Sequence, residues 1–135
     1  MKFRALLLAL ALVITVSGTT SAAVTEHRES TTNLSIAYPI LSAETGVVAD
    51  PINADIAALA ADVRAAYEDG EFYRGEFGYR VHLDDENFLS VTFTDLRYTL
   101  RGNQPTRQDY GFVYYKKTGQ RLPLAFFVHV TPSDL

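Results

Sequence analysis

The chain has 135 residues, enough for one small domain, and its content of 47% hydrophobic and 21% charged residues is ordinary for a globular protein. It contains no cysteine, which excludes a disulfide framework, a cysteine-ligated metal site and a cysteine nucleophile. The formal net charge of −4 gives no sign of the basic surface that nucleic-acid-binding proteins carry.

The first segment has the order of a secretory signal peptide. Lys2 and Arg4 precede an apolar run over residues 6–16, and small residues then lead to Ala23. A basic start, a short apolar run and small residues before the cleavage point are the three parts of such a signal. The run is shorter than the roughly 20 residues of a membrane-spanning helix. We therefore expect residues 1–23 to be removed on export, with an uncleaved anchor as the alternative.

The segment after the signal peptide divides into a lead-in and a strand. Residues 24–33 are polar and lack periodicity, which predicts a flexible lead-in, so the domain is expected over residues 34–135. Apolar residues alternate from Leu34 to Ile40 and predict a first strand. Because Pro39 has no N–H to donate, it predicts that this strand lies at a sheet edge.

A helix is predicted from residue 50 onward. Asp50 is expected as its N-cap and Pro51 as its first helical residue, and Gly70 is expected to end it. Large apolar residues recur inside it at spacings of four and three, which places them on one stripe. They are Ile52, Ile56, Leu59, Val63 and Tyr67. The stripe predicts that the helix packs against a sheet.

The rest of the chain reads as consecutive strands. They are expected over residues 77–83, 88–100, 110–115 and 120–124, with turns at 84–87 and 116–119 and a loop at 101–107. The alternation of the long strand changes face at Asp95, which predicts a bulge there. The apolar residues 125–130 are expected either to form a final strand or to leave a sheet edge exposed. Together these elements predict an α+β fold, with one amphipathic helix packed on an antiparallel meander sheet.

No group of residues has the spacing of a known catalytic or metal site. The acidic turn at residues 84–86 lacks the spacing of an EF-hand loop and is interpreted as a solvated hairpin turn. His82 and Asp84 share a strand face but cannot by themselves complete a zinc site. Neither a glycine-rich phosphate loop nor a G-x-S-x-G turn is present. The sequence therefore predicts no catalytic residue, no metal site and no cofactor.

Tyrosine is the distinctive excess, with eight residues, several of them near the loop at residue 101. A tyrosine offers a flat apolar surface with a polar tip, which suits contact with sugars or with a protein partner. Strand propensity and core packing are the alternative explanation for the excess. On the first interpretation the candidate ligand-binding residues are Tyr98, Arg101, Asn103 and Tyr110.

Four segments carry a resemblance to a known family. Residues 87–99, NFLSVTFTDLRYT, resemble the N-x-x-LS-(V/I)-x-F-x-x-Y-x-Y strand of secreted bacterial PdaC/RsiV-type domains. Residues 36–40 look like the first strand of that family, residues 51–56 like its I-N-x-x-I helix start, and residues 117–124 like its k-T-G-k-x-L-x-L hairpin. The resemblance covers about residues 34–124.

The resemblance implies an extracytoplasmic α+β domain that binds rather than catalyses. Such domains form the outer part of lysozyme-sensing anti-sigma factors and a non-catalytic part of a peptidoglycan deacetylase. The chain departs from the family at residues 99–105, where a histidine-containing loop is missing, and after residue 124, where the family continues into a second lobe.

These observations predict a secreted or periplasmic binding module without a membrane span after cleavage. Its ligand would be an envelope protein, lysozyme-like, or a peptidoglycan glycan, and not a nucleic acid. A peptidoglycan-modifying enzyme or accessory domain is one alternative. A truncated remnant without its second lobe is another.

Overall fold

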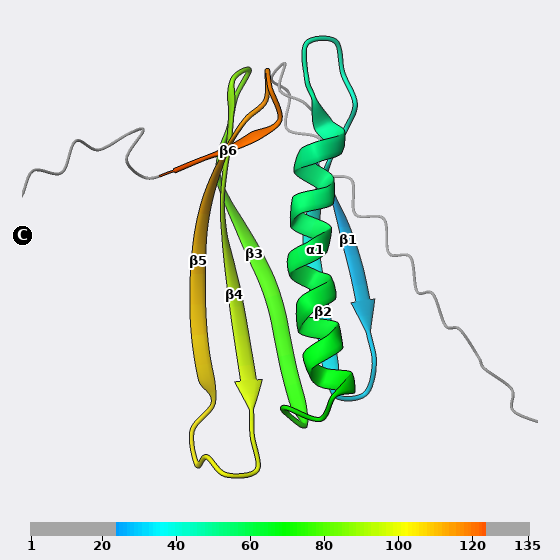
Figure 1. The fold of residues 1–135 in the computed structure, drawn as a ribbon, viewed down its shortest axis with the longest axis vertical. Helices are drawn as coiled ribbons and strands as arrows, with labels where there is room; N and C mark the ends of the chain where they lie inside the picture. Colours follow the sequence, from blue (N-terminus) through cyan, green and yellow to red (C-terminus); the bar gives the residue numbers. More distant parts are fainter. Residues whose placement is uncertain (1–23, 124–135) are drawn as a thin grey trace, which may run out of the picture.

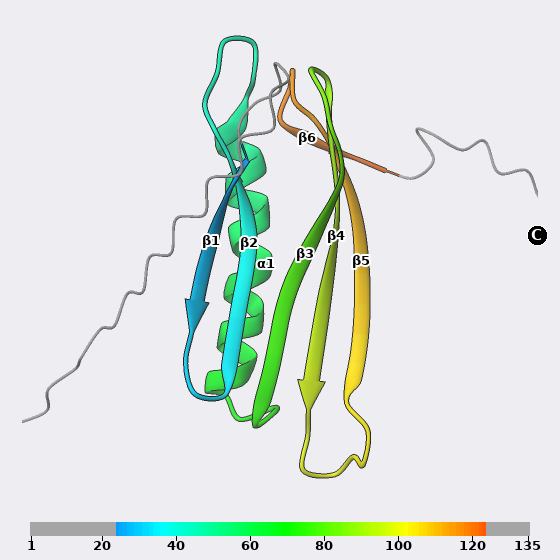
Figure 2. The same ribbon diagram turned by 180° about the vertical axis from the view of Figure 1, so that it is seen from behind.

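The computed structural model describes residues 24–123, which form one helix packed on a six-stranded sheet, as Figure 1 and Figure 2 show from opposite sides. The strands follow one another across the sheet in chain order. They are β1 (Val24–Ser30), β2 (Leu34–Leu41), β3 (Arg74–Asp84), β4 (Phe88–Tyr98), β5 (Thr106–Tyr115) and β6 (Gln120–Leu122), and the helix is α1 (Ala49–Glu68). The predicted α+β fold is confirmed. The predicted signal peptide and the apolar residues 125–130 lie outside the described residues.

The segment predicted as a flexible lead-in is instead an edge strand. β1 pairs antiparallel with β2 along its whole length. Its charged side chains are paired, Arg28 with Glu26, and Glu29 with Arg64 of α1. An edge strand with paired charges needs few apolar residues, so the polar sequence of β1 gave no strand periodicity.

The sheet departs from the expected meander at one junction, between β2 and β3. These strands are parallel and pair only through Leu34–Ile36 and Gly75–Phe77, whereas the other neighbours are antiparallel. The parallel pairing arises because α1 carries the chain back to the end of the sheet where β2 began. Beyond Ile36 the two strands separate, and α1 lies over the gap (Figure 2).

Pro39 lies in the part of β2 that β3 no longer reaches. The N–H of Leu41, two residues further on, donates to the Asn53 side chain of α1 and therefore points away from β1. Groups two residues apart on a strand point the same way, so the nitrogen of Pro39 also faces the open side, where no ladder bond is lost. The expectation that Pro39 marks an edge is correct locally, although β2 as a whole lies between β1 and β3.

α1 starts two residues earlier than predicted, and Asp50 is not its cap. The N-cap is Val48, which makes no side-chain capping bond, and Asp50 lies in the first turn. The predicted end at Gly70 is confirmed, since Gly70 has a φ of +77° and its N–H is bonded to the carbonyl of Tyr67. The buried residues of α1 are Ala49, Ile52, Ile56, Ala60, Val63 and Ala66. The buried stripe thus runs through small alanines, and Leu59 is only partly buried.

The core lies between α1 and the sheet. Its sheet side includes Leu89, Val91 and Phe93 of β4, and the ring of Phe93 stacks on that of Phe77 with centroids 5.5 Å apart. At its border the hydroxyl of Tyr114 donates to the carboxylate of Asp55 on α1, at 2.7 Å. Burial and this carboxylate raise the pKa of Tyr114, so its hydroxyl stays protonated and can keep the bond.

The bulge predicted at Asp95 is absent. β4 keeps an unbroken register with β5 around Asp95, and the irregularity lies in β3 between Val81 and Leu83. Asp95 continues the buried face of Phe93 and is itself buried, with Arg97 as its partner at 2.9 Å. A buried carboxylate paired with a partly exposed arginine, and not a bend, therefore interrupts the apolar alternation.

The two predicted hairpin turns are confirmed, and a buried lysine joins them. Lys116, in the turn between β5 and β6, is fully buried, and its ammonium group bonds to the Asp84 carboxylate and, at 2.6 Å, to the Asp85 carbonyl oxygen. The Asp85 carboxylate accepts bonds from the N–H groups of Phe88 and Asn87, which lowers the pKa of Asp85. The carboxylates of Asp84 and Asp85 are thus occupied by contacts within the protein.

Candidate functional site

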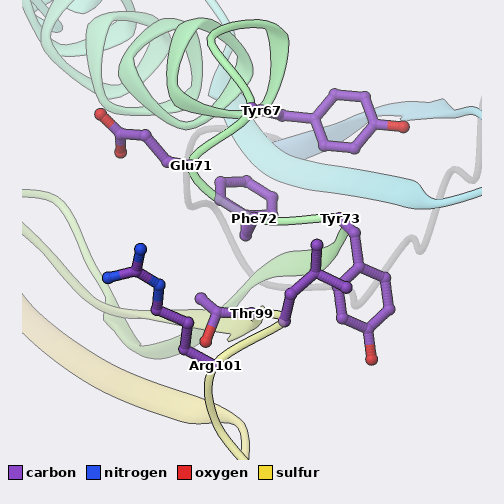
Figure 3. A pocket seen from close by; sticks show the side chains of 8 residues that line it. Tyr67, Glu71, Phe72, Tyr73, Thr99 and Arg101 are labelled. Atoms are coloured by element: carbon purple, nitrogen blue, oxygen red, sulfur yellow. The ribbon is translucent and has the colours of Figure 1, made fainter.

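A groove lies where α1 ends, β3 begins and β4 ends (Figure 3). Its volume is about 670 Å³, within the range of small-molecule sites, roughly 300–1,000 Å³. We call it the end groove. Its lining residues are Tyr67, Gly70, Glu71, Phe72, Tyr73, Thr99, Leu100 and Arg101. Tyr67 belongs to the last turn of α1, the next four residues follow the end of that helix, and the last three follow the end of β4.

The wall next to α1 is aromatic, and the backbone holds it in place. Gly70 turns the chain out of the helix, and Phe72 then turns its ring inward, 5.6 Å from the ring of Tyr67. The N–H of Tyr73 donates to the carbonyl of Tyr98, at 3.0 Å. The backbone of Tyr73 is therefore tied to the end of β4, while its side chain remains 49% exposed beside the groove.

The position of Phe72 depends on a glycine in β3. A Cβ atom at Gly75 would lie 2.5 Å from Cε2 of Phe72, closer than real contacts allow. Gly75 is buried, and its N–H donates to the carbonyl of Asn33 at 2.9 Å, which fixes its backbone. The ring of Phe72 can lie under the end groove because residue 75 has no side chain.

The two arginines at the end groove, Arg97 and Arg101, differ in their charge partners. The guanidinium of Arg97 lies 4.9 Å from the Phe72 ring centroid and pairs with Asp95 at 2.9 Å and with Glu71 at 3.4 Å. Its hydrogen bond with Asp95 raises the pKa of Arg97. Arg101 is exposed, and within residues 24–123 it forms no ion pair. The groove therefore presents one cation without a charge partner among these residues.

Of the four predicted ligand-binding residues, only Arg101 lines the end groove. The Tyr98 ring lies under the Arg74 guanidinium, 5.4 Å away, and Asn103 is exposed further along the loop. Tyr110 lies on β5, where its ring stacks on Phe112 and its hydroxyl bonds to the side chain of Gln108.

Tyr67 and Tyr73 are the tyrosines that the structure brings to the predicted loop. They precede the loop by some thirty residues in the chain and reach it only through the fold, so the sequence did not indicate them as groove residues. The one available signal was the aromatic pair Phe72-Tyr73 directly after the helix-ending glycine.

A second hollow, of about 340 Å³, lies along the junction of β2 and β3. Its polar groups are largely paired within the protein. The carboxylate of Glu26 accepts a bond from the Tyr79 hydroxyl at 3.0 Å and one from Arg28 at 2.7 Å. This hollow therefore has fewer groups to offer a ligand than the end groove.

The described residues do not assemble a metal centre. Among residues 24–123 no group of three or more histidine, aspartate or glutamate side chains is placed to hold an ion. His82 lies 2.7 Å from the Thr92 hydroxyl, and the ring of His27 lies 4.7 Å from that of Tyr38. In the same range no helix is long and apolar enough to cross a membrane.

Comparison of the sequence with models of known protein families gives no match, and comparison with the curated proteins gives no significant match.

Proposed function

We propose that this chain is a secreted, non-catalytic binding module of the bacterial cell envelope, and that its end groove binds a peptidoglycan glycan. The observation that carries the proposal is the pairing of exposed apolar surface with a cation that lacks a charge partner. In the groove, Tyr73 is 49% and Leu100 is 90% exposed, and Arg101 lies next to them. Exposed apolar side chains that lie together beside polar groups are typical of interaction sites.

The chemistry of the groove suits a glycan that carries carboxylates. Sugar rings present apolar C–H faces that pack against aromatic rings, and Tyr73 offers such a ring with a polar tip. Peptidoglycan also carries carboxylates, on its stem peptides and on lactyl groups to which no peptide is attached. An arginine such as Arg101 binds a carboxylate through two parallel hydrogen bonds.

A further observation supports a binding role. The resemblance of residues 87–99, which include all of β4, to PdaC/RsiV-type domains favours an extracytoplasmic binding role.

The test is co-sedimentation of the processed protein with insoluble peptidoglycan. Tyr73→Ala and Arg101→Ala are each expected to weaken binding by about tenfold, because residues at the centre of a binding site commonly contribute more than about 1.4 kcal/mol. Matched controls are Tyr110→Ala and Arg107→Ala, which change the same residue types on β5, outside the groove. These controls are expected to bind like the parent protein.

Two outcomes would contradict the proposal. Equal binding by all four variants would show that the end groove does not hold the glycan. Saturable binding to lysozyme in solution, lost in the groove variants and without any sedimentation with peptidoglycan, would identify a protein as the ligand.

A further inference from the structure

β1 forms one border of the described sheet. It pairs with β2 on one side, and Figure 1 and Figure 2 both show it as the outermost strand there. Within residues 24–123 no strand lies on its other side. An edge strand presents a row of backbone N–H and C=O groups with which a further strand can pair. The outer side of β1 is therefore a surface for strand addition.

Two contacts show which backbone groups of β1 face outward. Directly after β1, the N–H of Thr31 donates to the carbonyl of Leu34 at the start of β2, at 2.8 Å. At the other end, the N–H of Leu41 donates to α1 and points away from Val24, its partner on β1. Directions alternate along a strand, and two residues paired without mutual hydrogen bonds point away from each other. The residues whose backbone groups turn outward are therefore Val24, Glu26, Arg28 and Ser30.

We propose that the outer edge of β1 pairs with β1 of a second copy of this chain, antiparallel and about a two-fold axis at His27. In this register Glu26 lies opposite Arg28 of the second copy, and Val24 lies opposite its Ser30. All the outward-facing residues of β1 then form hydrogen-bonded pairs. His27 lies opposite its own counterpart, in a pair without mutual hydrogen bonds. Such an interface uses the same patch on both copies and closes as a dimer.

The charges on β1 favour this register. In one copy the Arg28 guanidinium lies 2.6 Å from the Glu26 carboxylate, and their side chains are 50% and 22% exposed. The second copy would bring the same two groups in the reverse order, so each carboxylate would lie beside two guanidinium groups. Opposite charges directly across a strand pair stabilise it, and like charges destabilise it. The edge is therefore complementary to itself.

A shift of the two-fold axis by one residue removes this match. An axis at Glu26 would place the two Glu26 side chains opposite each other, and an axis at Arg28 would do the same with the two arginines. An axis further along would leave some of the outward-facing groups unpaired. Charges on an edge strand usually oppose pairing with other chains. On β1 they oppose the neighbouring registers and admit the one at His27.

Single cysteines test the register, because the chain has no cysteine of its own. At the proposed axis the two residues 27 have Cα atoms about 4.5 Å apart, a distance that a disulfide can bridge. Thr25 lies on the same strand face, but its two copies would be about 13 Å apart along the strand, beyond that reach. Under mild oxidation His27→Cys should therefore form a disulfide-linked dimer at least about tenfold faster than Thr25→Cys.

Charge reversal tests the partner. Arg28→Glu places glutamates opposite each other and Glu26→Arg places arginines opposite each other, so each variant alone should lose the dimer. In an equal mixture every arginine lies opposite a glutamate, so the dimer should return. Arg80→Glu, the same change at an exposed position of β3, is the matched control and should dimerise like the parent protein. Sedimentation velocity over a concentration series measures the mass in each sample.

Amide exchange of the parent protein needs no substitution, which matters because Glu26→Arg also removes the hydrogen bond from Tyr79. The N–H groups of Glu26 and Arg28 should exchange more slowly as the protein concentration rises, whereas that of His27, which points to β2, should not change. A parent protein that stays monomeric across the series, or equal oxidation of the two cysteine variants, would overturn the proposal. A dimer that persists in both charge variants would overturn it in favour of another interface.

Discussion

At the scale of single residues, the ionisation of Tyr79 is tied to the fold. Its side chain projects from β3 toward β1, where its hydroxyl donates to the carboxylate of Glu26 at 3.0 Å. Burial of the ring, followed by this hydrogen bond and the charge of Glu26, raises the pKa of Tyr79 to about 12. The folded protein therefore favours the protonated, neutral form of Tyr79, because only that form can donate the hydrogen bond to Glu26.

This shift predicts a loss of stability at alkaline pH. Unfolded tyrosine ionises near pH 10, whereas folded Tyr79 stays neutral to about pH 12, so its stabilising effect is complete below pH 10 and is lost as the pH rises to 12. Over this pH window the free energy of unfolding of Tyr79→Phe should fall by about 1 kcal/mol less than that of the parent protein. The difference is no larger because the Tyr79 side chain is partly exposed, which weakens its interaction with Glu26. Urea denaturation at a series of pH values measures it.

Tyr110→Phe is the matched control, because it removes a tyrosine that does not contact Glu26. Tyr38 and Tyr114, whose pKa values are also raised, remain in both variants. Identical pH profiles for the two variants would contradict the assignment of the alkaline loss to Tyr79.

At the scale of the element, β3 contains two glycines with different surroundings. Gly75 lies against the ring of Phe72, whereas nothing lies within 4 Å of an added Cβ atom at Gly78. Neither has a positive φ, so the backbone conformation does not require glycine at either position. The requirement at Gly75 comes from packing against the segment that lines the end groove.

Gly75→Ala is therefore expected to lower the free energy of unfolding by about 1–3 kcal/mol, the usual cost of overpacking. Because it displaces Phe72, it should also weaken peptidoglycan binding. Gly78→Ala, in the same strand, should leave stability unchanged or raise it by up to about 1 kcal/mol, because alanine restricts the unfolded chain. Urea denaturation and co-sedimentation measure the two effects, and equal destabilisation by both substitutions would contradict the packing argument.

At the scale of the whole molecule, α1 links two parts of a sheet that share only a short pairing. β2 and β3 pair over three residues each and then separate. Past the separation, the side chain of Asn53 takes the place of a neighbouring strand. It accepts the N–H of Leu41 at 2.8 Å and donates to the carbonyl of Leu41 at 2.9 Å. Both backbone groups of Leu41 are thereby satisfied in a buried position.

Asn53→Ala should lower the free energy of unfolding by about 1–3 kcal/mol, because it leaves the buried backbone groups of Leu41 without partners. The measurement is urea denaturation, with Asn103→Ala as a control at an exposed loop position. Amide exchange at Leu41 should rise in the Asn53 variant and not in the control. Unchanged exchange there would show that the Asn53 contact does not hold β2 to α1.

The candidate site could be predicted only in part. The sequence pointed to the loop after β4 and to Arg101, because a polar loop with tyrosines nearby is visible along the chain. Its partners Tyr67 and Tyr73 could not be found that way, since they enter the end groove from α1 and from the segment before β3. The predicted Tyr98 and Tyr110 are near Arg101 in sequence, but Tyr98 lies under Arg74 and Tyr110 stacks on β5.

Local patterns by themselves determined the helix, its end at Gly70, the two hairpin turns and the α+β class, because helical periodicity, positive-φ glycines and turn residues act within a few positions. The tertiary structure alone decided the parallel pairing of β2 with β3, the strand at β1 and the burial of Asp95. Each of these depends on partners distant in the chain. Paired charges make a polar edge strand and a buried carboxylate stable, and no local pattern reveals which residues will supply the opposite charge.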